Sequence, residues 1–320
     1  MANAANFQYE YFSSVTQRKV EWLWYPYIPY GKLTIIQGDP GEGKSTFILN
    51  IAALLTKGKA MPDGFHVSGP QKVVYQTAED NLADTVKPRL LSAGADCDQV
   101  AYIVDDECSL TLEDSRIEEV IRQTGARLFI LDPLQAYLSQ DSDMFSPGRM
   151  RQQLKKLADI AAKYHCAVVV IGHMNKASGE KNLYRGLGSI DIAAIARSVL
   201  MISRDKGDPN IRYMFPVKSS LAPEGSTIAF TFEKKRGLKW IGACDVGRDQ
   251  IEDCSIDESK WALAIRIIRE MLEEQDRRSS DVLQKLKVMG ISERTAHSVK
   301  KQMGVTSYKK DNVWFWHLND

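Results

Sequence analysis

Short apolar segments alternate with helical patterns over the first half of the chain. The apolar segments are residues 33–36, 72–77, 100–104, 128–132 and 167–172. Between them, apolar side chains recur at helical spacing in residues 44–57, 82–92, 113–123 and 148–164. This alternation is typical of a parallel sheet that helices cover on both faces. We therefore expect an α/β fold.

The pattern changes after residue 198, where strand-like segments follow one another closely. These segments are residues 198–203, 211–218, 226–233 and 237–242. Strands with such short connections usually pair in antiparallel fashion, so we expect them to extend the same sheet.

The C-terminal region differs again. Residues 243–257 are polar and without periodicity, which predicts a linker. Three helical patterns follow, at 258–274, 279–288 and 292–303, and then two strand-like pieces near 305–308 and 313–318. Three helices and a hairpin predict a winged helix-turn-helix. The expected organisation is an N-terminal extension (1–20), an α/β domain (21–242), the linker (243–257) and a small domain (258–320).

Composition limits the location and the redox state. The chain has 320 residues, of which 44% are hydrophobic, but its apolar runs are far too short to span a bilayer. The N-terminus lacks a basic segment followed by an apolar one, so we expect a soluble, cytoplasmic protein with no membrane partner. The five cysteines form no C-x-x-C pair, so we expect reduced, mostly structural thiols and no metal cluster: Cys97, Cys108, Cys166, Cys244 and Cys254.

The segment GDPGEGKST at residues 38–46 has the spacing of a P-loop and lies between a predicted strand and a predicted helix. Its glycines allow backbone N–H groups to face phosphates, and the helix N-terminus adds a positive dipole end. Lys44 would bridge the β- and γ-phosphates, and Ser45 would ligate Mg²⁺. The predicted ATP-binding residues are Gly38, Asp39, Pro40, Gly41, Glu42, Gly43, Lys44, Ser45 and Thr46.

Several polar residues follow other apolar segments at the same edge of the predicted sheet. Asp132 would be the second Mg²⁺ ligand, with helix capping as the alternative. Glu79 and Asp80 follow residues 72–77, and one of them would orient the attacking water. The residues alone do not choose between the two. His173 would sense the γ-phosphate, with a structural histidine as the alternative.

Five ordered motifs resemble those of the RecA-like ATPases, and most of all the plasmid RepA-type hexameric helicase branch. They are GDPGEGKST, VVYQTAED, LFILDPLQAY, VVVIGHMNKA and YRGLGSIDIAAIARSVL. The resemblance covers roughly residues 20–242. It implies that Glu79 is the water-activating carboxylate, that Asp132 is the Walker B aspartate and that His173 reads the γ-phosphate.

RecA-like rings place ATP between subunits, where an arginine of the neighbour completes the site. In DnaB- and RadA-like relatives this arginine comes two residues after a lysine, but here Lys218 is followed by Ser219 and Ser220. The RepA resemblance implies Arg197 instead, with Arg185 as the alternative. Lys218 and Arg89 are further candidates for phosphate contacts. We therefore expect a homo-oligomer, with a hexamer as the candidate form.

Two segments, 134–146 and 174–188, are positioned like the DNA-binding loops of RecA-type proteins. In the second, Lys176, Lys181 and Arg185 would contact the phosphates of single-stranded DNA, with a plain solvated loop as the alternative.

Positive charge gathers near the C-terminus. The whole chain has a net charge of +1, whereas residues 278–311 hold eight Lys and Arg against three acidic residues, a net of +5. We expect duplex DNA to bind here, although winged helices can also dock proteins. Arg294, Lys300 and Lys301 belong to the predicted recognition helix, and Lys309 and Lys310 to the wing.

The sequence thus predicts an enzyme that hydrolyses ATP with Mg²⁺ and moves on or remodels DNA during replication or recombination of a mobile element. The alternative is a DNA-tethered regulatory or loading ATPase without strand-displacement activity. Both hypotheses require ATP and DNA.

Overall fold

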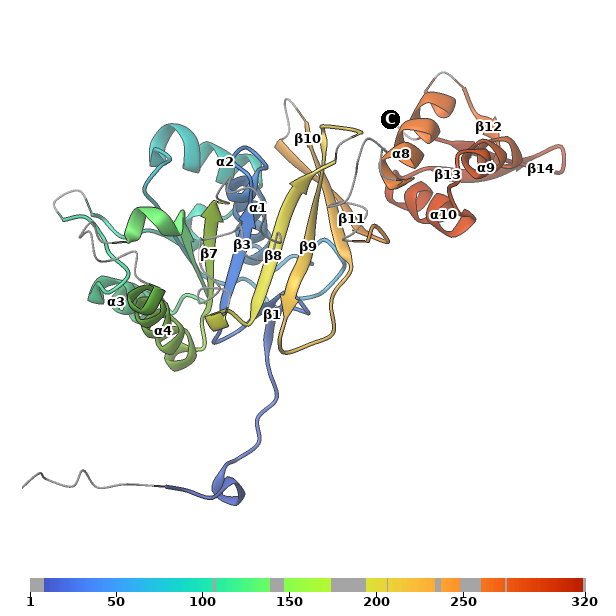
Figure 1. Cartoon of the computed structure of the whole chain (residues 1–320). Coiled ribbons are helices and arrows are strands. Elements are labelled where there is room, and N and C mark those ends of the chain that lie inside the picture. Colours follow the sequence, from blue (N-terminus) through green and yellow to red (C-terminus); the bar gives the residue numbers. More distant parts are fainter. Residues whose placement is uncertain are drawn as a thin grey trace, which may run out of the picture.

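The computed structural model describes residues 9–105, 108–138, 147–173, 194–205, 207–233, 237–247, 260–273 and 275–318. Within these residues, one large sheet holds the α/β part together (Figure 1). Its first six strands are β3 (Leu33–Gly38), β4 (Val73–Thr77), β5 (Val100–Ala101), β6 (Leu128–Asp132), β7 (Ala167–His173) and β8 (Ser198–Arg204). These six are parallel, and β3 lies between β7 and β8.

The predicted antiparallel extension is confirmed. It consists of β9 (Ile211–Ser219), β10 (Thr227–Glu233) and β11 (Gly237–Cys244), which follow β8 in the sheet. The full strand order is β11-β10-β9-β8-β3-β7-β6-β4-β5. The described residues thus form an α/β fold with a mixed sheet.

One predicted strand is much shorter than expected. The apolar pattern covers residues 100–104, yet β5 ends at Ala101. The side-chain oxygen of Gln76 accepts a 2.8 Å hydrogen bond from the Ile103 N–H, so a side chain takes the place of the next ladder bond. The chain beyond Ala101 therefore leaves the sheet.

Helices cover both faces, as the alternation of strands and helices predicts (Figure 1). On one face α1 (Lys44–Thr56) packs with the π-helical turn η2 (Leu82–Val86) and α2 (Lys87–Ser92). On the other lie α3 (Ser115–Thr124) and α4 (Pro147–Tyr164). Neighbouring residues of β3 enter different cores: Ile35 packs on the α3 and α4 side and Ile36 on the α1 side.

Aromatic residues before β3 pack onto the α1 face. Strands β1 (Trp22–Trp24) and β2 (Ile28–Pro29) form a two-stranded sheet, and Trp24 stacks on Phe47 of α1 with ring centroids 6.4 Å apart. Trp24 and Tyr27 are buried, so these aromatic residues pack in the core and are not available for base stacking.

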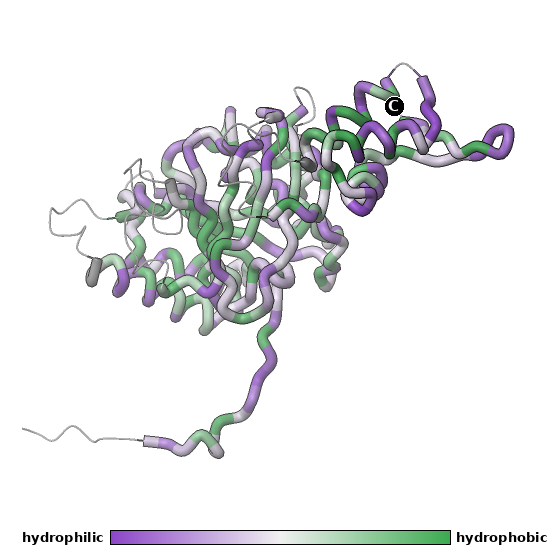
Figure 2. The backbone as a smooth tube through the Cα atoms, turned by 45° about the vertical axis from the view of Figure 1, so that its right-hand side comes forward, coloured by the Kyte–Doolittle hydropathy of each residue, from purple (hydrophilic) through white to green (hydrophobic). Residues whose placement is uncertain are grey.

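The C-terminal part contains the predicted three helices and a hairpin. They are α8 (Lys260–Leu272), α9 (Ser279–Val288), α10 (Glu293–Gln302), β13 (Thr306–Lys310) and β14 (Val313–His317). The short strand β12 (Arg277–Arg278) also pairs with β14. Trp261 and Trp316 are buried, whereas the hydrophilic tip of the hairpin projects away from the rest of the molecule (Figure 2). The domain boundary at 243–257 stays a prediction, because most of that segment lies outside the described residues.

The C-terminal helices also touch the edge of the large sheet. The side-chain amide of Gln302 donates a hydrogen bond to the carbonyl of Ala243, and Arg294 pairs with Asp245 at 3.3 Å. In the described part of the chain, no helix is both long and apolar enough for a membrane span.

Candidate functional site

The P-loop connects the end of β3 to the start of α1. A side chain at Gly43, whose φ is +88°, would place its Cβ 2.6 Å from Cζ of Phe232. A Cβ at Gly38 would meet the carbonyl oxygen of Ile202. Only glycine fits both places, so the glycine spacing read from the sequence follows from the close approach of β8 and β10.

Lys44 is held inside this loop. Its Nζ donates hydrogen bonds of 2.8 Å to the carbonyl oxygens of Gly38 and Asp39. Burial lowers the pKa of Lys44, and the nearby Asp132 and Glu42 oppose that shift. The buried ammonium is thus bonded to the loop itself, and a phosphate that binds it would displace these carbonyl oxygens.

Ser45 and Asp132, the two predicted magnesium ligands, contact each other through a side-chain hydrogen bond. The Tyr75 hydroxyl donates a second bond, of 2.8 Å, to Oδ2 of Asp132. Burial raises the pKa of Asp132, while the bonds from Ser45 and Tyr75 lower it. The sequence analysis did not identify Tyr75 as a site residue, although Tyr75 and Gln76 are neighbours on a predicted strand.

The donor set fits Mg²⁺ bound together with a nucleotide. Hydroxyl and carboxylate oxygens are its preferred protein ligands, and it usually keeps water and phosphate oxygens in the remaining positions. No group of three or more His, Cys, Asp and Glu that could hold a metal occurs among the described residues. A magnesium ion at Ser45 and Asp132 would thus depend on phosphate oxygens.

The two candidate carboxylates after β4 have different surroundings. Thr77 of β4 pairs with Asp132 of β6, and the backbone N–H groups of Glu79 and Asp80 both approach Oγ1 of Thr77 at 3.4 Å. Asp80 forms a 2.5 Å ion pair with Arg89. The same ion pair engages Arg89, which the sequence analysis named as a candidate for a phosphate contact. Glu79 is exposed and close enough to raise the pKa of Lys44 by its charge.

Arg197 lies at the opposite end of β3 from the P-loop. Its backbone N–H donates to the carbonyl of Leu33, the first residue of β3, and its side chain is exposed. Because β3 separates Leu33 from Gly38 by five residues, or about 17 Å, Arg197 is poorly placed to reach its own P-loop. Lys218 lies nearby and donates a 2.9 Å bond to the carbonyl of Ala196. Burial, followed by the charge of Arg197, lowers the pKa of Lys218.

The remaining predicted residues are only partly described. The sheet register sets the backbone of His173 opposite Gly38, at the edge where a γ-phosphate sensor belongs. Lys176, Lys181 and Arg185 lie outside the described residues, as does most of the first predicted DNA loop.

Comparison with known proteins identifies the family. Residues 6–179, more than half of the chain, match the AAA_25 model, which is described as an AAA domain. The chain belongs to this AAA domain family. Its P-loop and Asp132 both lie inside the matched region.

Two curated relatives are DNA repair proteins named RadA. The chain is 28% identical to RadA of Halalkalibacterium halodurans over 149 residues, which are 46% of this chain and 28% of the relative. It is 25% identical to RadA of Synechocystis sp. over 154 residues, again 46% of this chain and 29% of the relative. The chain thus spans less than a third of the length of these relatives.

A solved structure of a DnaB-like replicative helicase, described with its interactions with primase, has a similar fold. The match has a TM-score of 0.50 and 16% identity over 66% of this chain and 57% of the other. Together with the family match, these similarities support a RecA-like P-loop ATPase.

Further charged and aromatic residues, from strands β8, β9 and β10, lie beside the P-loop, and the sequence analysis did not find them. Arg204 donates a 3.2 Å bond to the carbonyl of Gly41 and lies 3.8 Å from a carboxylate oxygen of Glu42. Arg212, paired with Arg204 across β8 and β9, lies 4.5 Å over the ring of Phe232. Knowing that β8 lies next to β3 would have revealed Arg204, but single-sequence patterns do not give strand order.

The predicted DNA contacts of the C-terminal helices and hairpin are described. Lys301, Lys309 and Lys310 are exposed. Lys300 of the predicted recognition helix is half-buried: its Nζ donates to Ser307 and lies 5.1 Å from the ring of Trp316. Both contacts are made with the hairpin, which folds back over the end of α10.

Proposed function

We propose that this protein hydrolyses ATP with Mg²⁺ in order to move on or remodel DNA, as a ring-forming helicase of the RepA and DnaB kind. The observation that carries the proposal is the contact of Ser45 with Asp132 next to the buried ammonium of Lys44. These three groups bring together a phosphate-binding cation and a magnesium-type oxygen pair at one edge of the sheet.

The chemistry follows from these positions. The P-loop amides and Lys44 bind the phosphates, while Ser45 and Asp132 would hold Mg²⁺, which would neutralise negative charge on the phosphates. Glu79 orients a water molecule that attacks the γ-phosphorus as the bond to the β-phosphate breaks, and the proton leaves with the phosphate product. The position of Arg197, far from its own P-loop, supports a role in the site of a neighbouring subunit.

DNA is proposed as the substrate on two grounds. The RadA relatives and the DnaB-like helicase are named for work on DNA, and residues 278–311 carry a net charge of +5. We infer that the C-terminal helices and hairpin act as a winged helix on duplex DNA, and that single-stranded DNA binds near residues 174–188. A role in replication or recombination of a mobile element is part of the same proposal.

A second candidate is a DNA-tethered regulatory or loading ATPase that does not separate strands. The ion pair of Arg294 with Asp245 favours it, because this contact ties the predicted recognition helix to the edge of the ATPase sheet. ATP binding by such a protein could release the helix instead of driving a motor.

Strand displacement on a forked DNA duplex separates the two functions. The proposal expects ATP-dependent displacement together with ATP hydrolysis that single-stranded DNA stimulates, and both should be lost in Lys44→Ala. ATP hydrolysis without displacement on forks of either polarity would instead support the regulatory function. Nucleotide binding measured for Lys44→Ala and for the unchanged chain shows whether the P-loop is the site.

A further inference from the structure

The hairpin of β13 and β14 presents a large aromatic side chain to solvent near its tip. Trp314 is 53% exposed, whereas Trp316, two residues further along β14, is buried. Residues two apart on a strand lie on the same face, so both rings belong to one face of the hairpin. The tip projects away from the helices, as Figure 2 shows. The ring of Trp314 therefore lies outside the core, where a partner can reach it.

The fold of the hairpin holds Trp314 in place. Two residues join the strands, Asp311 and Asn312, and their φ angles are +48° and +64°. Positive φ at both positions is typical of the tight turn whose twist matches that of the flanking strands. On the opposite face of the hairpin, the rings of Tyr308 and Phe315 stack with their centroids 5.7 Å apart. An aromatic side chain on such a support loses little conformational freedom when it binds.

Trp314 lies on the face of the hairpin that α10 covers. In the register of the two strands, Lys309 lies opposite Trp314, and Ser307 lies opposite the buried Trp316. Cross-strand partners share a face, so these four side chains are on one side. Lys300 of α10 donates to Ser307 from this side. The exposed ring is thus on the same side of the hairpin as the predicted recognition helix.

The charges on the elements that border the ring favour a nucleic acid. Three lysines belong to α10 and β13: Lys300, Lys309 and Lys310. Asp311 in the turn opposes them, and residues 278–311 keep a net charge of +5 with this aspartate included. Asp276, before β12, is engaged by a tyrosine hydroxyl at 2.6 Å and a histidine nitrogen at 2.7 Å. An exposed aromatic ring with an excess of lysines is the usual composition of a site for unpaired nucleotides.

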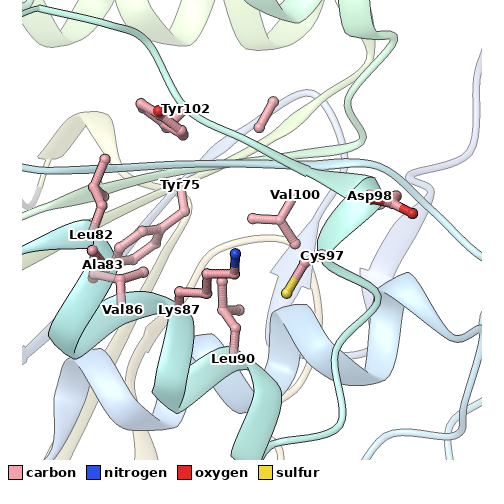
Figure 3. Close-up of a pocket in the computed structure, with 11 residues that line it drawn as sticks. Tyr75, Leu82, Ala83, Val86, Lys87, Leu90, Cys97, Asp98, Val100 and Tyr102 are labelled. Carbon is pink, nitrogen blue, oxygen red and sulfur yellow. The ribbon is translucent and has the colours of Figure 1, made fainter.

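The pocket between α2 and β5 also has an exposed tyrosine near a lysine (Figure 3). Its volume is about 420 Å³, and its walls include Lys87 and Tyr102, which is 51% exposed. Asp98 lines the same pocket and balances the charge of Lys87. A site for nucleic acid needs an excess of positive charge, because the phosphates dominate the affinity. The hairpin meets this condition, and the lining of this pocket does not.

We propose that Trp314 stacks on the first unpaired base of a DNA fork, while the lysines beside it bind the neighbouring phosphates. The proposal rests on the DNA function proposed above and names the DNA structure that the C-terminal helices and hairpin bind. Aromatic side chains stack on bases of any sequence, so the contact reads the shape of the DNA and not its sequence.

A junction between duplex and single strands suits this surface better than either form of DNA alone. Inside a duplex, each base is covered by its neighbours, so a ring enters only after two stacked bases are pulled apart. An unpaired base at a fork already exposes its face. The predicted recognition helix α10, on the same side as Trp314, would contact the adjoining duplex. One surface thus meets both parts of the fork.

Fluorescence anisotropy of labelled DNA, with the full chain and without ATP, tests the proposal. The probes are a fork, the same duplex without unpaired arms, and two forks in which the first unpaired nucleotide of one arm or the other lacks its base. Trp314→Ala should weaken fork binding about tenfold, the usual effect of losing one stacked base, and leave duplex binding almost unchanged. The missing base should weaken binding of the unchanged chain by a similar factor on the arm that Trp314 contacts.

The two losses should not add. If Trp314 stacks on the missing base, Trp314→Ala binds the intact fork and the abasic fork equally, because each change removes the same contact. The phosphates of the two forks are identical, so DNA contacts elsewhere in the chain cancel in the comparison. Additive losses would overturn the proposal. Equal weakening of fork and duplex binding by Trp314→Ala would overturn it as well, because the ring would then act within the paired region.

Two variants serve as controls. Trp314→Phe keeps an aromatic face and should retain most of the fork affinity. Tyr102→Ala removes a ring of similar exposure from the pocket in Figure 3 and should leave fork binding unchanged. A chain that binds none of the probes at low salt would overturn the DNA function itself. Binding of the unchanged chain that is insensitive to the missing base on both arms would overturn the stacking alone.

Discussion

The hydroxyl of Tyr75 donates a 2.8 Å hydrogen bond to Oδ2 of Asp132, from β4 to the adjacent strand β6. Both residues are buried, so the carboxylate depends on this donor and on Ser45 in place of water. Tyr75 reaches Asp132 from β4 and Ser45 from the first turn of α1, so the two bonds together orient the carboxylate. Tyr75 thus holds a predicted metal ligand without itself being one.

Tyr75→Phe should lower the free energy of unfolding by about 1–3 kcal/mol, the usual cost of leaving a buried acceptor with one partner fewer. Urea unfolding measures this difference. Tyr102→Phe is the control, because Tyr102 is half-exposed in the same region, and it should change stability by less than about 0.5 kcal/mol. Equal effects of the two substitutions would mean that the hydrogen bond to Asp132 does not contribute to the free energy of unfolding.

Glu79→Gln should reduce ATP turnover by about 10²–10⁴-fold while nucleotide binding is retained, because the variant keeps the size of the side chain and loses its basicity. Asp80→Asn should change turnover far less, since the carboxylate of Asp80 is engaged with Arg89. Phosphate release and nucleotide fluorescence give the two measurements. The reverse ranking of the two variants would transfer the water-orienting role to Asp80.

Arg197→Ala should lose turnover as a pure preparation and regain part of it when mixed with Glu79→Gln subunits. At a mixed interface, the intact Glu79 of one subunit meets the intact Arg197 of its neighbour. Turnover is measured across mixing ratios, with co-assembly checked by a tag on one variant. If co-assembled mixtures stay inactive, Arg197 does not act across the interface.

Lys309→Glu with Lys310→Glu should weaken duplex DNA binding and flatten its salt dependence. The log–log slope should fall by about 0.9 for each DNA phosphate that the variant no longer neutralises. Both lysines are exposed at the hairpin tip, so folding should be unaffected. The matched control is Lys59→Glu with Lys155→Glu, an equal charge change at exposed lysines of the α/β part. Binding that survives the hairpin change at moderate salt would favour protein docking by this region.

Much of the fold could be predicted because its strands and helices have strong periodicity. The run AVVVIG has the continuous apolar character of a strand buried on both faces, and β7 begins at Ala167 as expected. Trp314 and Trp316 alternate at strand spacing, and one of them, Trp316, is in the core. The prediction failed at residues 102–104 because the competing hydrogen bond from Ile103 to Gln76 joins residues that are distant in the sequence and so depends on tertiary structure.

The site was predictable in part for a similar reason. The P-loop and Asp132 belong to contiguous motifs, so their positions follow from local sequence. Tyr75, Arg204 and Arg212 reach the site through strand order and register, which no local pattern records. The choice between Glu79 and Asp80 depends on which carboxylate pairs with Arg89, and a single sequence gives no sign of that ion pair.

The two carbonyl bonds made by Lys44 have a consequence for nucleotide selectivity. A phosphate that binds the Lys44 ammonium must break its bonds to Gly38 and Asp39. The binding free energy therefore gains only the difference between the new hydrogen bond and the old ones. A doubly charged terminal phosphate competes well with neutral carbonyls, because charge-assisted bonds are about twice as strong. A nucleoside monophosphate, which has no β-phosphate to reach Lys44, leaves the loop bonded to itself. The loop therefore selects nucleotides by the length of their phosphate chain, independently of any contact with the base.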